Sequence, residues 1–127
     1  MCSSLVTVTF PECTFLGSYA FQQCNHLITA TFPKCSLICN NAFYMCSLLT
    51  NISFPSCIDI GYGAFWFCSS LTTASFPNCT SISGNAFANC HSLTTIYFPV
   101  CTYISSGAFS ICTGLISASF PQCSYVG

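Results

Sequence analysis

The chain of 127 residues is almost uncharged: 2% of its residues are Asp, Glu, Lys or Arg, 53% are hydrophobic, and the formal net charge is -1. A typical soluble domain is about 25% charged. Because the chain lacks a basic surface, we expect it to bind neither nucleic acid nor anionic lipid. Ser, Thr and Asn interrupt the apolar residues every few positions, so no stretch reaches the roughly 20 apolar residues of a spanning helix, and we expect no membrane insertion.

A repeat of 22 residues runs through the whole sequence without insertion or deletion. Two cysteine columns follow it: Cys2, Cys24, Cys46, Cys68, Cys90 and Cys112, and Cys13, Cys35, Cys57, Cys79, Cys101 and Cys123. A Phe-Pro pair and an Ala-Phe pair recur at the same interval, as in Phe76-Pro77 and Ala86-Phe87. Five full repeats span residues 2-23, 24-45, 46-67, 68-89 and 90-111, and a partial sixth spans 112-127. This regularity predicts one solenoid domain over residues 1-127.

Each repeat is predicted to begin with a short strand. In the fourth repeat, Ala74 and Phe76 alternate with Thr73 and Ser75. This period of two residues indicates a strand with one buried face. Pro77 then removes a backbone donor and ends the strand.

The rest of the repeat is predicted to return the chain to the next strand. A second inward run covers residues 79-82, and a polar or glycine-rich turn follows. Ala86, Cys90 and Leu93 are then spaced i, i+4 and i+7, which predicts a short helical turn. The predicted fold is an α/β repeat solenoid with a parallel β-sheet on one side and short helical turns on the other. Stacked coils bury a continuous core and align the phenylalanines in two internal ladders.

Two segments carry a family resemblance: CSSLTTASFPNCTSISGNAFANC (68-90) and CHSLTTIYFPVCTYISSGAFSIC (90-112). They resemble the BspA-type leucine-rich repeats, whose unit has the form C-x-x-L-x-x-h-x-h-P-…-I-…-A-F-x-x-C. The resemblance covers essentially the whole chain and implies a right-handed leucine-rich-repeat coil. It also implies a role like that of relatives, which are cell-surface or secreted proteins acting in adhesion and binding. This chain differs in its Phe-Pro pairs, its second cysteine column and its lack of charge.

Twelve of the thirteen cysteines are interpreted as buried thiols, and Cys39 as the one that could be exposed. Twelve follow the repeat at inward positions, and coils stacked at about 4.8 Å hold them farther apart than the roughly 3.8 Å between Cβ atoms that a disulfide prefers. Small hydrophobic thiols are therefore favoured over disulfides. Cys39 lies outside both columns. With Cys35 it could not form a zinc site without two further ligands, so no metal and no cofactor are expected.

The titratable residues are too few for catalysis. The chain has one Asp, one Glu and two His, and acid-base chemistry needs two such groups that can meet. Glu12 and Lys34 share a repeat position on successive coils, so we expect an ion pair between them, worth at most about 1 kcal/mol if exposed. His26 and His91 are expected at the surface. We predict that the chain is not an enzyme.

The outward strand positions form a regular, uncharged array. Its candidate binding residues are Thr7, Thr9, Thr29, Thr31, Thr73, Ser75, Thr95 and Tyr97, and the other members are Asn51, Ser53, Ser117 and Ser119. Such Thr-x-Thr ladders resemble those of ice-binding proteins. The alternative is that Thr and Ser simply occupy the solvated face of a sheet, where they are common.

The two positions after each Ala-Phe pair vary most. They read Gln22-Gln23, Tyr44-Met45, Trp66-Phe67, Ala88-Asn89 and Ser110-Ile111. The second and third coils therefore place Tyr44, Met45, Trp66 and Phe67 together, with Leu48 close behind. If exposed, these five residues are the best candidate for a partner contact. The alternative is that about half of the rings fold back onto the neighbouring turn.

Neither end of the sequence shows the polar, atypical repeat that caps soluble solenoids. The sequence enters the first repeat at Cys2, so we expect either that a leader was removed or omitted, or that secretion uses another route. Uncapped coils predict head-to-tail stacking of copies into a filament.

The function predicted first is therefore a self-associating structural solenoid, extracellular or at the cell surface. One alternative is a monomeric adhesion or ligand-binding module of a larger surface protein, whose partner is another surface protein. The other alternative is an ice-binding protein.

Overall fold

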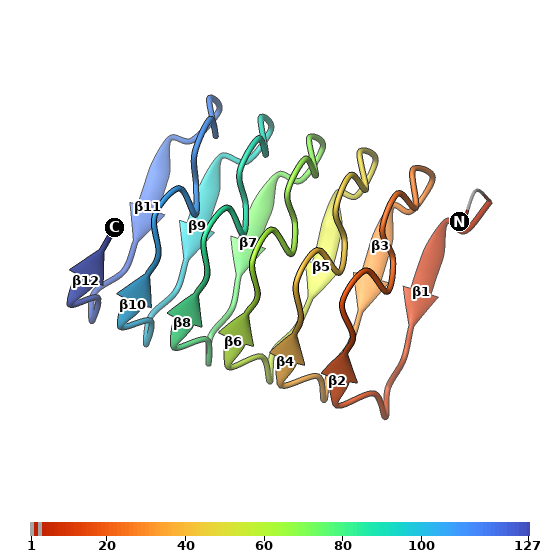
Figure 1. The fold of residues 1–127 in the computed structure, drawn as a ribbon, viewed down its shortest axis with the longest axis horizontal. Helices are drawn as coiled ribbons and strands as arrows, with labels where there is room; N and C mark the ends of the chain where they lie inside the picture. The colour runs from red at the N-terminus through yellow and green to blue at the C-terminus, as the bar shows by residue number, and fades with distance from the viewer. Residues whose placement is uncertain (1, 3) are drawn as a thin grey trace.

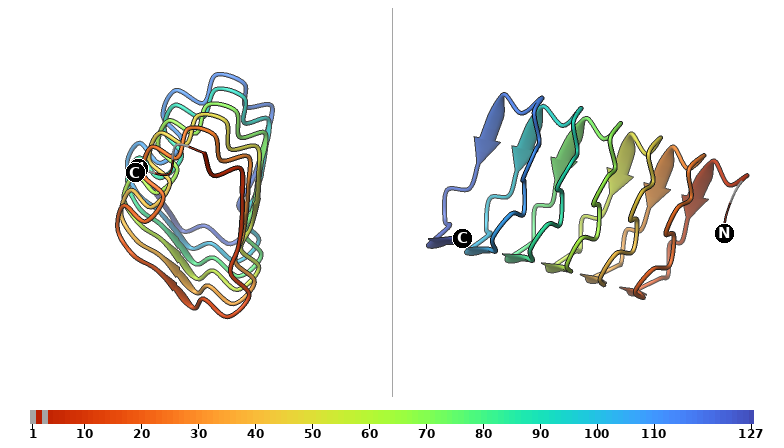
Figure 2. Two further views of the ribbon diagram at one scale, coloured as in Figure 1. Left: turned by 90° about the vertical axis from the view of Figure 1, so that its right-hand side faces the viewer. Right: turned by 45° about the horizontal axis from the view of Figure 1, so that its top comes forward.

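The computed structural model describes residue 2 and residues 4-127, and these form a solenoid with its two ends far apart (Figure 1). Successive coils lie on one another in register, so that Thr7 pairs with Thr29 and Ile104 pairs with Val126. Figure 2 shows the outlines of the coils nearly superimposed when the solenoid is viewed from one end. We number the coils 1 to 6 after the six repeats of the sequence. The predicted repeat solenoid is confirmed.

Each coil contributes a long strand and a short strand. The long strands are β1 (Thr7–Thr9), β3 (Thr29–Thr31), β5 (Asn51–Ser53), β7 (Thr73–Ser75), β9 (Thr95–Tyr97) and β11 (Ser117–Ser119). The short strands are β2 (Phe15–Leu16), β4 (Leu37–Ile38), β6 (Asp59–Ile60), β8 (Ser81–Ile82), β10 (Tyr103–Ile104) and β12 (Tyr125–Val126). The short strands form one parallel six-stranded sheet, whereas the long strands form two three-stranded sheets, β1-β3-β5 and β7-β9-β11. Parallel strands thus occupy two sides of the solenoid, where the sequence predicted one.

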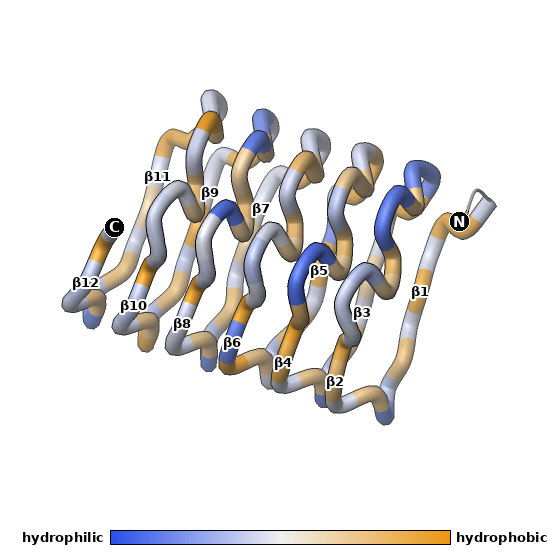
Figure 3. The backbone as a smooth tube through the Cα atoms, viewed as in Figure 1, coloured by the Kyte–Doolittle hydropathy of each residue, from blue (hydrophilic) through white to orange (hydrophobic). Residues whose placement is uncertain are grey.

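Alternation along the long strand explains why it forms. In β7 the side chain of Ala74 is buried, while Thr73 and Ser75 on either side are exposed. Pro77 ends the strand, and the N–H of Cys79 donates to the carbonyl of Phe76 (3.2 Å) to close the corner. Figure 3 shows apolar residues returning at the same place in successive coils.

The predicted helical turns are wrong, because the structure contains no helix among residues 4-127. The third side of each coil is a series of tight turns. In coil 4, Asn85 (φ 56°) and Asn89 (φ 58°) adopt left-handed backbone conformations, which interrupt a right-handed helix. Successive N–H groups donate in turn within the coil and to the next coil. The N–H of Ala88 donates to the carbonyl of Asn85 in the same turn (3.0 Å), whereas the N–H of Asn89 donates to the carbonyl of Ser110 in the next coil (2.8 Å). Hydrogen bonds between coils thus replace those of a helix.

The core contains the two predicted ladders of phenylalanine, which are confirmed, together with columns of buried Leu, Ile, Cys and Ala. In the Phe-Pro ladder, the rings of Phe32 and Phe54 stack 5.1 Å apart. In the Ala-Phe ladder, Phe43 and Phe65 stack 5.2 Å apart. The ladders meet edge to face, as between Phe43 and Phe54 at 5.9 Å and 74°. Such pairs add about 0.5–1.5 kcal/mol each beyond the burial of their area.

All thirteen cysteines are free thiols, and most column members are buried. Their hydrogens are used locally: Cys68 Sγ donates to the carbonyl of Phe43 (3.2 Å), and Cys79 Sγ donates to that of Ser81 (3.2 Å). Burial raises the pKa of Cys46 and of Cys79 to about 12, so both thiols stay neutral at physiological pH. They act as small apolar residues, as predicted.

Candidate interaction site

The five residues predicted as a partner contact lie on the turn side of coils 2 and 3. Tyr44 and Trp66 are half-buried, whereas Met45, Leu48 and Phe67 are exposed. The ring of Tyr44 contacts Trp66 (centroids 5.4 Å apart) and Phe67 (6.2 Å). The structure therefore brings the three rings together across two coils. The rings of Tyr44 and Trp66 fold partly back onto the surface, whereas that of Phe67 is exposed. The alternative interpretation expected about half of the rings to fold back.

Tyr62 belongs to the same cluster, although the sequence pattern did not predict it as a contact residue. Its ring meets Trp66 edge to face at 6.3 Å and 84°, and it is 44% exposed. Its hydroxyl accepts a hydrogen bond from Asn85 Nδ2 (2.9 Å), and its N–H donates to Asn40 Oδ1 (3.0 Å). The signal was present, because the equivalent positions carry small or polar residues: Ser18, Asn40, Gly84 and Ser106. We call Tyr44, Met45, Leu48, Tyr62, Trp66 and Phe67 the aromatic patch.

The backbone of the aromatic patch is strained. Met45 (φ 60°) and Phe67 (φ 62°) both adopt the left-handed conformation, which costs a residue with a Cβ roughly 1–2 kcal/mol. Their N–H groups are fixed to the next coil, Met45 to Trp66 (2.8 Å) and Phe67 to Ala88 (3.0 Å). Asn89 fills the equivalent place in coil 4, and Asn tolerates this conformation better. Gln23 and Ile111 have the same conformation in coils 1 and 5, so it belongs to the repeat; in coils 2 and 3 the position carries the exposed side chains of Met45 and Phe67.

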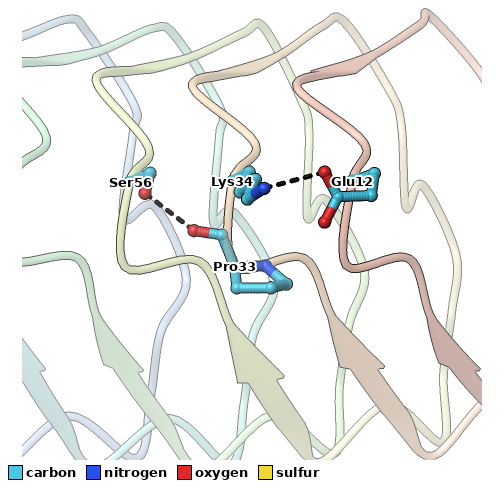
Figure 4. A network of polar contacts seen from close by, with 4 residues as sticks. All are labelled: Glu12, Pro33, Lys34 and Ser56. Carbon is cyan, nitrogen blue, oxygen red and sulfur yellow. Dashed lines mark hydrogen bonds and ion pairs between the residues drawn. The ribbon is translucent and has the colours of Figure 1, made fainter.

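No charged side chain belongs to the aromatic patch. Glu12 and Lys34 form the predicted ion pair, with Nζ 2.7 Å from Oε2, at the corner after the long strands (Figure 4). Their side chains are 79% and 58% exposed, so the pair contributes little stability. In the next coil Ser56 occupies the same position and donates to the carbonyl of Pro33 (2.7 Å). Asp59 lies in β6 and is half-buried.

The residues with catalytic chemistry do not form a site in the described part of the chain. His26 and His91 are exposed, as predicted. Residue 2 and residues 4-127 contain no group of three or more His, Cys, Asp and Glu side chains placed to hold a metal ion, and they enclose no pocket. No helix in this part is long and apolar enough to cross a membrane.

The outward strand array is divided. Thr7, Thr9, Thr73, Ser75, Thr95 and Tyr97 are exposed, while Thr29 and Thr31 are half-buried. The residues pair in register within each three-stranded sheet, as Thr73 does with Thr95. However, β5 and β7 do not pair, so the regular pairing of the array is interrupted between coils 3 and 4. Ice binding stays a prediction, which a thermal-hysteresis measurement tests.

Leu27, Leu49, Leu71 and Leu93 form one fully buried column and Ile38, Ile60 and Ile82 form another. A parallel solenoid built on such columns is typical of a leucine-rich-repeat protein. The model of the family described as BspA type leucine rich repeat region matches residues 1-116 in six copies. The chain therefore belongs to the BspA-type leucine-rich-repeat family. None of the curated proteins matches it.

Solved structures of bacterial leucine-rich-repeat proteins are similar at 28% identity. A leucine rich cell surface protein from Faecalibacterium prausnitzii matches with a TM-score of 0.85 over 91% of this chain and 32% of its own. The T. pallidum leucine rich repeat protein matches at 0.87 over 92% and 59%. A leucine-rich repeat protein from Bacteroides ovatus matches at 0.82 over 90% and 30%. The chain thus spans less than two thirds of the length of each.

Proposed function

We propose that this chain is a non-catalytic interaction module of a cell-surface or extracellular protein, and that it binds a protein partner through the aromatic patch. The observation that carries the proposal is the gathering of four aromatic rings on the surface of coils 2 and 3, those of Tyr44, Tyr62, Trp66 and Phe67, beside the exposed side chain of Met45. Exposed apolar side chains that gather in one place are typical of interaction sites. The surface location is supported by the similar F. prausnitzii protein, which is described as a cell surface protein.

The chemistry of the aromatic patch suits a protein partner. Trp and Tyr side chains contribute most to binding where they are packed into a partner and shielded from water. Because the patch carries no charge, we expect association through apolar burial and hydrogen bonds, with little dependence on salt. The hydroxyl of Tyr62, already bonded to Asn85 (2.9 Å), supplies polar character at the edge.

Trp66 is the only tryptophan of the chain, so its fluorescence reports on the patch directly. A partner is identified by cross-linking the labelled chain to intact cells, and is then purified and titrated. We expect Phe67→Asn to weaken the complex about tenfold or more, which is the effect of losing one central ring. The control is Ile111→Asn, at the equivalent position of coil 5 outside the patch (φ 58°). Equal affinity of both variants and the wild type would refute the proposal.

End-to-end association is the second candidate. In the chain of 127 residues, the end coil exposes Ile116 (86%) and Val126 (71%). Strand β11 pairs with β9 along one edge, and a second copy of this 127-residue chain would pair along the other. Sedimentation velocity with negative-stain microscopy distinguishes the outcomes. Growing filaments support stacking, whereas a monomer at all micromolar concentrations excludes it.

A further inference from the structure

The long-strand side of the solenoid is interrupted between coils 3 and 4. There β5 and β7 follow one another along the solenoid (Figure 1). They belong to different sheets, because no strand pairing joins them. We call the contact between residues 50-54 and residues 72-76 the seam.

Backbone amides that bond between coils elsewhere have no backbone acceptor at the seam. The N–H of Phe32 donates to Ser53 of the next coil (2.9 Å), whereas the equivalent N–H of Phe54 makes no backbone hydrogen bond. Likewise the N–H of Thr94 donates to Thr72 of the previous coil (2.9 Å), but that of Thr72 makes none. The ladder of hydrogen bonds is therefore missing at both ends of the seam.

The side chains of the core are also farther apart at the seam. The rings of Phe54 and Phe76 are 6.0 Å apart, against 5.1 Å for Phe32 and Phe54. The inward residue Ile52 is only half-buried, whereas its counterpart Ala74 is 1% exposed. Packing on this side is looser than at the neighbouring interface.

The other two sides of the same interface are intact. The short strands β6 and β8 pair in register, and the N–H of Ser83 donates to Ile60 (2.9 Å). On the turn side the N–H of Phe65 donates to Ala86 (2.7 Å), and the rings of Phe65 and Phe87 stack at 5.1 Å. Coils 3 and 4 are thus joined firmly along two sides and weakly along the third.

Asn51 stands beside the seam, where the other coils have Thr or Ser. The first outward position of the long strand reads Thr7, Thr29, Asn51, Thr73, Thr95 and Ser117. Asn is disfavoured in strands, and its amide competes for local hydrogen bonds. Here Asn51 Nδ2 donates to Thr50 Oγ1 (2.9 Å).

We propose that the solenoid bends at the seam: coils 1–3 and coils 4–6 are two units that open on the long-strand side and hinge about the short strands and the turn side. Side-chain hydrogen bonds flank the seam, from Ser69 Oγ to the carbonyl of Ser47 (3.3 Å) and from Asn78 Nδ2 to that of Pro55 (2.7 Å). They break when the seam opens. Bending changes the curvature of the solenoid while its phenylalanine ladder on the turn side stays stacked.

Residue-resolved hydrogen exchange of the full chain tests the hinge. We expect the amides of Phe54 and Thr72 to exchange about tenfold or more faster than the matched amides of Phe32 and Thr94. The amides of Ser83 and Phe65, on the intact sides, should exchange slowly. Equal protection at the seam and at the matched positions would overturn the proposal. Fast exchange on all three sides would also overturn it, because the coils would then separate without a hinge.

The variant Asn51→Thr tests whether Asn51 weakens the seam. It restores the threonine column and should slow the exchange of Phe54 and Thr72 about tenfold, with little change at Ser83. The matched control is Thr95→Asn in coil 5, which should accelerate exchange between coils 4 and 5. Unchanged seam exchange in Asn51→Thr would refute the role of Asn51.

Discussion

The indole ring of Trp66 stacks on the ring of its sequence neighbour Phe67, with centroids 5.6 Å apart and planes inclined by 16°. Successive side chains of an extended chain point in opposite directions. Phe67 has a left-handed backbone (φ 62°), and this turn geometry lets the two adjacent rings lie side by side. The stacking of these two rings therefore depends on a left-handed backbone, which the repeat supplies at this position in every complete coil.

Ile111→Asn should stabilise the fold by about 0.5–1 kcal/mol. Ile111 is β-branched, is 57% exposed and has a φ of 58°. Branched side chains are strained in this conformation, whereas Asn adopts it readily. Urea denaturation monitored by circular dichroism gives the change in the free energy of unfolding. A loss of stability in this variant would show that strain at this position is negligible.

Phe67→Asn should stabilise the fold less than Ile111→Asn does, or should destabilise it. It relieves the same backbone strain, but it removes ring contacts with Trp66 and Tyr44, worth about 0.5–1.5 kcal/mol for each aromatic pair. The same denaturation experiment compares the two variants. An equal gain in both would mean that the ring contacts of Phe67 contribute nothing to the fold.

Phe65→Ala should destabilise the chain by about 3–5 kcal/mol, because it leaves a cavity within both ladders. The ring of Phe65 is fully buried. Phe10→Ala is the control, since the ring of Phe10, at the start of the Phe-Pro ladder in the first coil, is 48% exposed. Its cost should be clearly smaller in the same urea titration. Similar losses of stability in both variants would contradict the account, because Phe65 is fully buried and Phe10 is half exposed.

Stability should fall as the pH rises above about 9. Burial raises the pKa of Cys46 and Cys79 from 9.0 to about 12, so the native state keeps protons that the unfolded state has lost. The stabilisation is complete below pH 9 and decreases as the pH rises towards 12. Thermal melts between pH 7 and pH 11, under reducing conditions, measure this. Cys79→Ala should make the decrease shallower, and a flat profile in the wild type would contradict burial of neutral thiols.

Much of the fold follows from the position of each residue within the 22-residue repeat. The columns through Cys68 and Phe76 face inward because stacked coils repeat the same environment, and the same phase predicted the ion pair of Glu12 and Lys34. The helical prediction failed because apolar residues spaced i, i+4 and i+7 also face inward in a series of turns. The contrary signal was Asn85 and Gly107, at a position that requires a left-handed backbone.

Two features of the surface depend on single positions that break the pattern. Tyr62 stands where other coils have small or polar residues, and only the structure shows its ring reaching Trp66. Asn51 stands where the other coils have Thr or Ser. The repeat does not reveal that backbone hydrogen bonds are missing at the seam beside it.

The most direct test of the proposed function is the fluorescence of Trp66 during titration with the purified partner. If the aromatic patch is the binding site, the emission should shift to shorter wavelength and quenching by iodide should fall as the complex forms. Binding that leaves both the emission and the quenching unchanged would contradict the central claim, because the partner would then contact another face of the solenoid.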